Sequence, residues 1–143
     1  MRFLLMAMML ASCRGILAAP TAIVSDHRAQ AVIVTPAKPP AVVTYAAKEL
    51  REHLQKASGA ELKIIAEHEL TEDDQVRIYL GACRQTIAGG LDLASLPGRG
   101  YYVRTGDREL FLAGFDGAGA VDNVSTAAGT LYAVYHWLES QLK

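Results

Sequence analysis

Residues 31–66 read AVIVTPAKPPAVVTYAAKELREHLQKASGAELKIIA, and this stretch decides the class of fold. Ala31–Thr35 is a short apolar run rich in β-branched residues, which is typical of a buried strand. Apolar residues then recur every three or four positions, a spacing that predicts an amphipathic helix from about Ala41 to Lys56. The residues expected on its buried face are Val43, Ala46, Ala47, Leu50, Leu54 and Ala57. Gly59 suits the helix end, because glycine adopts the left-handed conformation without steric strain. Glu61–Ala66 is then a second strand.

Three more strands are predicted further along the chain. Val76–Leu80 alternates apolar and polar residues, which indicates a strand with one solvated face. Tyr101–Thr105 and Glu109–Ala113 flank a turn that contains glycine, which is a good signal for a hairpin. A loop rich in glycine and alanine follows over residues 114–126.

A second amphipathic helix is predicted from about Ala127 to Leu142. The residues expected on its buried face are Leu131, Val134, Tyr135, Leu138 and Leu142. The element order is then β-α-β-β-β-β-α. This order predicts an α+β fold, with a mostly antiparallel, mixed β-sheet on which the two helices pack.

The N-terminal part has the composition of an export signal. A basic start is followed by the apolar run Phe3–Leu10, which is too short to span a membrane, since a spanning helix needs about 20 residues. We expect a signal peptide over residues 1–19 and a polar, irregular tether over residues 20–30. The protein is therefore expected outside the cytoplasm, either periplasmic or secreted.

Two ways of processing this signal stay open. The sequence LASC at residues 10–13 resembles a bacterial lipobox, which would place a lipid on Cys13 and make that lipid the protein's only link to a membrane. The small residues at positions 17–19 instead suit ordinary cleavage before Pro20.

Charge and cysteine content argue against a nucleic-acid partner and against an internal disulfide. The net charge is −1, and Lys and Arg are interleaved with acidic residues, so no nucleic-acid partner is predicted. Cys83 is the only cysteine outside the predicted signal, so no internal disulfide is expected.

The glycine-rich stretch LAGFDGAGA, at residues 112–120, raises the question of phosphate binding. Its spacing is G-x-x-G-x-G, the reverse of the dinucleotide fingerprint, and the predicted helix begins well after the first glycine. No G-K-[ST] sequence is present either. We therefore interpret the stretch as a connector between the hairpin and the last helix.

No catalytic, cofactor-binding or metal-binding residue is predicted. The histidines His27, His53, His68 and His136 form no HExxH motif, and Cys83 has no base nearby in the sequence. The acidic residues Asp73, Asp74, Asp107, Asp116, Asp122 and Glu139 show no pattern that would pair two of them across a glycosidic bond.

Aromatic residues on the last predicted helix are candidates for binding. Tyr135 falls on the expected core face, whereas Tyr132 and Trp137 do not fall cleanly on it. An exposed aromatic residue on such a helix more often meets a neighbouring domain than a sugar ring. Tyr132 and Trp137 are therefore candidate domain-docking residues.

Three segments together resemble one known family. They are AAKEL at residues 46–50, IYLG at residues 78–81, and GTLYAVY at residues 129–135 followed by Leu138-Glu139. In this pattern, residues 31–143 resemble the accessory domain found before the catalytic barrel in alpha-glucuronidases and beta-hexosaminidases. The connector looks longer than in that family.

The resemblance implies a mostly structural role beside a (β/α)₈ barrel, which is absent from this chain and takes about 250 residues. The family's catalytic residues lie in that barrel, so none is carried over, and no cofactor is implied. In one reading the chain is the accessory domain of an exported glycoside hydrolase and its partner is a barrel in the same polypeptide. The alternative is a free-standing extracytoplasmic domain that binds a glycan or a protein. An exposed apolar patch that includes Trp137 would favour the first, and a shallow aromatic groove the second.

Overall fold

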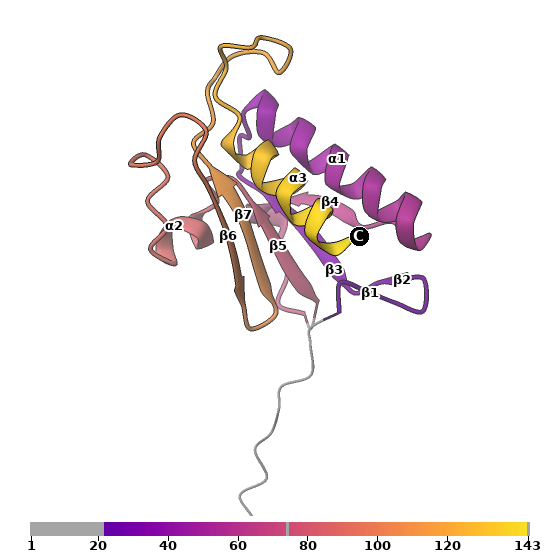
Figure 1. The fold of residues 1–143 in the computed structure, drawn as a ribbon. Helices are drawn as coiled ribbons and strands as arrows, with labels where there is room; N and C mark the ends of the chain where they lie inside the picture. The colour runs from indigo at the N-terminus through magenta and orange to yellow at the C-terminus, as the bar shows by residue number, and fades with distance from the viewer. Residues whose placement is uncertain (1–21, 74, 143) are drawn as a thin grey trace, which may run out of the picture.

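The structure, a computed structural model, describes residues 22–73 and 75–142, and within them the main element is a five-stranded sheet in the order β4-β3-β5-β7-β6. The strands are β3 (Ala31–Thr35), β4 (Lys63–Ala66), β5 (Val76–Leu80), β6 (Tyr101–Gly106) and β7 (Glu109–Gly114). The helices in the same residues are α1 (Ala41–Ser58), the short α2 (Arg84–Ala88), α3 (Gly129–Gln141) and the 3-10 turn η1 (Glu67–Glu69). Figure 1 shows α1 and α3 side by side on one face of the sheet.

The α+β class and the mixed sheet are confirmed, but most strand pairings are parallel. β3 pairs in parallel with β4 and β5, β5 pairs in parallel with β7, and β6–β7 is the antiparallel hairpin. The expected predominance of antiparallel pairs was wrong. Every residue of Ala31–Thr35 is buried, as is usual for a parallel strand covered on both faces. Helix α1 is the crossover that returns the chain in parallel from β3 to β4.

Helix α1 forms where the apolar spacing predicted it. Its buried residues are Val42, Val43, Ala46, Ala47, Leu50 and Leu54. Gly59 ends the helix with φ of 77°, and its N–H donates to the Gln55 carbonyl. The buried face differs from the expected one at two positions, because Ala57 in the last turn is exposed and Val42 is buried in addition.

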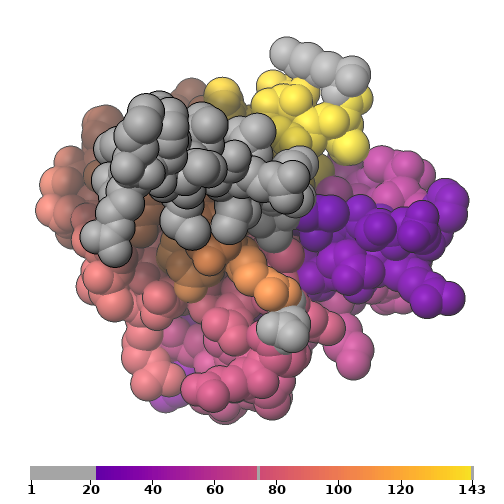
Figure 2. Space-filling view, turned by 90° about the horizontal axis from the view of Figure 1, so that it is seen from below, coloured from indigo at the N-terminus to yellow at the C-terminus, as the bar shows by residue number. Residues whose placement is uncertain are grey.

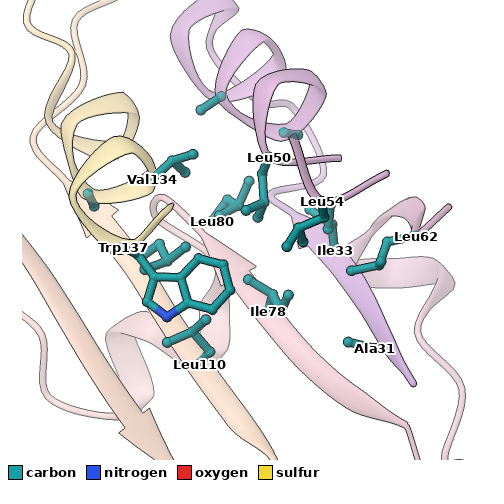
Figure 3. Close-up of a cluster of buried hydrophobic side chains, with 14 of the residues drawn as sticks. Ala31, Ile33, Leu50, Leu54, Leu62, Ile78, Leu80, Leu110, Val134 and Trp137 are labelled. Atoms are coloured by element: carbon teal, nitrogen blue, oxygen red, sulfur yellow. The ribbon is translucent and has the colours of Figure 1, made fainter. Parts of the chain in front are cut away.

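Helix α3 covers nearly the predicted residues but presents a different side to the sheet. Its buried residues are Gly129, Thr130, Ala133, Val134, Trp137 and Leu138. Of the expected face, Leu131 and Tyr135 are half-buried and Leu142 is exposed. The apolar residues of α3 lie on most sides of the helix, so their spacing alone does not determine its rotation. Figure 3 shows the Trp137 indole between α3 and the sheet, beside Leu110.

Apolar side chains cover both faces of the sheet. Helices α1 and α3 enclose a core that includes Ile33, Leu50 and Ile78 on one face (Figure 3). A second cluster lies on the opposite face, where the segment that contains α2 packs over the sheet. Its members are Val32, Val34, Tyr79, Cys83, Leu91, Leu93, Phe111 and Ala113. Alternate residues of each central strand thus enter different cores.

The described part of the predicted tether, residues 22–30, contains a small hairpin where irregular chain was expected. Strands β1 (Val24–Ser25) and β2 (Arg28–Ala29) pair antiparallel, and Ile23, beside them, packs against the core under α1 and α3. Figure 2 shows this hairpin, in indigo, at one side of the molecule. The predicted signal peptide and Cys13 lie outside the described residues.

Candidate functional site

The carboxyl ends of β3, β5 and β7 meet at one edge of the sheet, because the three strands are parallel (Figure 1). From β3 the chain continues into α1 on one face, whereas from β5 it continues into the α2 segment on the opposite face. Two neighbouring strands whose connections leave on opposite faces create a topological switch point. Open α/β sheets commonly bind ligands at such a point.

A pocket of about 570 Å³ lies at this edge, and we call it the strand-end pocket. Its apolar walls include Pro40, Val43, Ile87, Leu91, Leu93 and Phe115. Two carboxylates, those of Asp92 and Asp116, also line it. Ile87 and Phe115 are 54% and 43% exposed, although both are large apolar residues. The pocket is therefore an apolar hollow with two acidic groups.

Asp116 has a defined structural role at the start of α3. Its Oδ1 accepts the Thr130 N–H at 2.9 Å, and its Oδ2 accepts the Thr130 hydroxyl. It thus caps a helix whose own N-cap residue, Ala128, has no side chain that can do so. Burial raises the pKa of Asp116 above its ordinary value, and the two hydrogen bonds from Thr130 partly oppose this.

Glycines allow the end of β7 and the start of α3 to touch. A Cβ on Gly114 would lie 2.4 Å from the carbonyl carbon of Gly129, and a Cβ on Gly129 would lie 2.7 Å from the Gly100 carbonyl oxygen. Between them the chain folds back on itself, with the Gly117 N–H donating to the Ala127 carbonyl at 2.8 Å. This loop joins hairpin to helix, as the sequence predicted, and its first glycine serves close packing.

A second, shallower hollow of about 350 Å³ lies along the outer side of α3, and we call it the aromatic groove. It is lined by Arg99, Tyr101, Tyr132, Tyr135, His136 and Glu139. The rings of Tyr101 and His136 are 5.7 Å apart and tilted by 48°. The Tyr135 hydroxyl donates to Glu49 of α1 at 3.0 Å, and burial and this carboxylate raise the pKa of Tyr135.

Of the two predicted docking residues, only Tyr132 lies in the aromatic groove. Its side chain is 37% exposed, whereas Trp137 is 8% exposed and belongs to the core between α3 and the sheet. The expectation of an exposed Trp137 was wrong, because α3 is rotated relative to its predicted orientation. The sequence did not single out Tyr101 or His136 for the groove.

Three further candidates for chemistry have environments that explain them without a catalytic role. Cys83 is buried, and burial, with a smaller effect of Glu67, raises the pKa of its thiol to about 12, so it is a poor nucleophile. His27 and His53 bond through Nδ1 to the backbone carbonyls of Ser58 and Glu49. Among the residues that the structure describes, no group of three or more His, Cys, Asp or Glu side chains could hold a metal ion.

The strand-end pocket was not predicted from the sequence. Its walls come from the start of α1, from the α2 segment that the sequence left unassigned, and from the connector after β7. One signal could have found it. The fully apolar strand Ala31–Thr35 favours parallel pairing, and parallel strands bring their carboxyl-end loops together.

Comparison with models of known protein families and with curated protein sequences gives no match. The resemblance to the accessory domain of alpha-glucuronidases and beta-hexosaminidases thus remains a prediction from the three sequence segments. In the described part of the chain, no helix has both the length and the apolar character needed to cross a membrane.

Proposed function

We propose that this chain is a non-catalytic accessory domain of an exported glycoside-hydrolase-type protein and supports a (β/α)₈ barrel in the same polypeptide. The observation that carries this proposal is the aromatic outer side of α3. Trp137 and Leu138 belong to the core and Tyr135 packs against it, yet Tyr132 is 37% exposed in the aromatic groove. This makes the outer side more apolar than a solvated helix face requires. Such a surface is typical of one that packs against another domain.

The position of the groove beside the outer strand β6 supports the same role. β6 is an outer strand of the sheet, and Tyr101, its first residue, lines the aromatic groove. A domain packed on the groove would also cover this end of the edge strand. Proteins commonly protect such edges, because their unpaired backbone groups attract other strands.

The alternative function is that of a free-standing extracytoplasmic domain that binds a glycan or a protein through the same groove. Arg99 and Glu139 favour it, because they add charged hydrogen-bonding groups to an aromatic surface. The burial of Trp137 favours it as well, since it leaves a shallow aromatic groove rather than a broad apolar patch.

The intact mass of the mature protein from its native cells separates the two functions. A species of several tens of kilodaltons would support the accessory domain, because a barrel adds about 250 residues. A species no larger than the 15.4 kDa of this chain would contradict it and support the free-standing domain. A lipid mass on Cys13 would show membrane anchoring, and an unmodified start near Pro20 would show plain export.

A variant then tests the groove itself. In the full polypeptide, Tyr132→Ala should weaken docking by about 1–3 kcal/mol, the usual range for an interface aromatic residue. Calorimetry would then show this domain unfolding before the barrel. Val124→Ala is the control, because Val124 is exposed in the connector and does not line the groove. The glycan site would be favoured by a different pair of results. Tyr132→Ala would leave the two unfolding transitions coupled as before, and it would abolish oligosaccharide binding in a titration.

A further inference from the structure

The strand-end pocket is a second hollow with its own chemistry, and the class of ligand that it fits is independent of the proposed function. None of the described residues that line it also lines the aromatic groove. Its volume of about 570 Å³ falls within the roughly 300–1,000 Å³ of small-molecule sites. It also lies at the switch point between β3 and β5, where such sites recur.

The apolar walls of this pocket are not explained by the core. Ile87 and Phe115 face solvent with about half of their surface, and neither belongs to the two buried clusters. Leu91 and Leu93 are buried in the second cluster and also line the pocket. An apolar ligand body lying on these side chains would remove their exposed surface from water, which is favourable in proportion to the area covered.

The charges in the pocket determine which apolar ligand fits. Asp92 and Asp116 line it, and no Lys, Arg or His does so among the described residues. The hydrogen bonds to the Asp116 carboxylate come from neutral donors of Thr130, so its negative charge has no partner of opposite sign there. A half-buried carboxylate against apolar walls is poorly solvated, and a ligand cation would compensate it.

We infer that the strand-end pocket binds a small organic cation, an ammonium group on an apolar body. The body lies against Phe115, Ile87 and Leu91, and the ammonium lies toward Asp92 and Asp116. The aromatic ring of Phe115 adds a surface that also attracts cations. An anionic ligand of the same shape is disfavoured, because it would meet two carboxylates in a pocket of low polarity.

Three probes of similar size and different charge test this inference on the whole chain. They are phenethylamine, which is cationic at pH 7, the neutral 2-phenylethanol and the anionic phenylacetate. We expect saturable shifts of backbone amide signals in NMR spectra for phenethylamine, centred on Gly90, Gly114 and Phe115. We expect affinity at least tenfold weaker for phenylacetate, with the neutral probe between them.

Matched variants locate the charge and the apolar contact. Asp92→Asn removes a charge at an exposed site, and its amide oxygen can still accept the Ser95 N–H. It should weaken phenethylamine binding several-fold and leave 2-phenylethanol binding nearly unchanged. Phe115→Ala should weaken the binding of both probes. Asp107→Asn, in the exposed β6–β7 turn, changes the net charge by the same amount and should leave the binding of both probes unchanged.

Three results would overturn the inference. They are equal affinity for phenethylamine and phenylacetate, shifts centred on the aromatic groove instead of the pocket, and no saturable shift at millimolar probe. The folding of each variant is checked by its amide spectrum, and Phe115→Ala gives a second reading should Asp92→Asn disturb its loop.

Discussion

Helices α1 and α3 lie on the same face of the sheet, yet their orientations follow from the sequence to different degrees. α1 has a charged outer side, which includes the Lys48–Glu52 ion pair at 3.7 Å, and its predicted buried face is nearly correct. α3 carries Tyr132 and His136 on its outer side, and its predicted face is turned. Polar residues on one side therefore indicate how a helix is rotated, and where apolar residues lie on most sides, as in α3, their spacing alone does not.

The largest expected effect separates the two sides of α3. Trp137→Ala removes a buried indole from the core and should lower the free energy of unfolding by about 3–5 kcal/mol. Tyr132→Ala, on the outer side, should lower it by less than about 1 kcal/mol in the isolated domain. Urea unfolding followed by circular dichroism measures both. Similar losses for the two variants would contradict a rotation of α3 that buries Trp137 and exposes Tyr132.

The starts of the two helices differ as well, and this allows a second test. α1 follows Pro40, whereas α3 begins against the end of β7, where Gly114 and Gly129 touch. Gly114→Ala places a Cβ within 2.4 Å of backbone and should destabilise the fold by about 1–3 kcal/mol or more. Gly98→Ala is the control, because a Cβ there meets nothing within 4 Å. Equal thermal unfolding midpoints for the two variants would show that the contact is not tight.

Local signals allowed much of the fold to be predicted. Helix α1, the strands β3 and β5 and the β6–β7 hairpin follow from spacing, proline and glycine positions over a few neighbouring residues. Strand order does not follow from such signals, because the pairing of β3 with β5 joins residues more than forty positions apart. The strand Ala31–Thr35 did hold a clue, since a run buried on both faces favours a parallel neighbour.

The candidate sites were less predictable than the fold. Tyr132 was identified from its place on the last helix, but its neighbour Tyr101 joins it only when β6 packs beside α3. The strand-end pocket needs Val43, Leu91 and Phe115 from three distant segments, which meet only once the sheet order is set. Predicting either hollow therefore requires the sheet topology first, and the sheet was predicted as mostly antiparallel, whereas most of its pairings are parallel.

A smaller effect is expected where the two helices are joined directly. The Tyr135 hydroxyl donates to Glu49 of α1, and Tyr135→Phe removes this bond. Because the carboxylate is charged and half-buried, we expect a loss of about 1–2 kcal/mol in urea unfolding. Tyr132→Phe, which removes a hydroxyl from the outer side of the same helix, should be nearly neutral. Equal and negligible losses in both variants would mean that the bond contributes nothing to holding α3 against α1.

The smallest effect concerns helix capping, which distinguishes α3 from α1. Asp116 caps α3, whereas the N-cap residue of α1, Pro40, makes no side-chain cap bond. Asp116→Asn keeps an acceptor for the Thr130 N–H, and the amide can donate to the Thr130 hydroxyl oxygen. It should therefore change stability little near pH 4.

The pH dependence of this variant carries the sharper prediction. Because the folded pKa of Asp116 is raised above its unfolded value, folding favours the protonated acid. This contribution is fully present below the unfolded pKa, about 3.9, and is lost as the pH rises through the folded pKa. The groups that face this carboxylate are Thr130 and Gly81, with Asp92 elsewhere on the pocket wall. Relative to the unsubstituted chain, Asp116→Asn should thus become more stable between pH 4 and pH 7, while Asp107→Asn should show no such trend. Urea unfolding at both pH values measures the difference, and a variant that loses stability toward pH 7 would show that the ionised cap bonds outweigh burial.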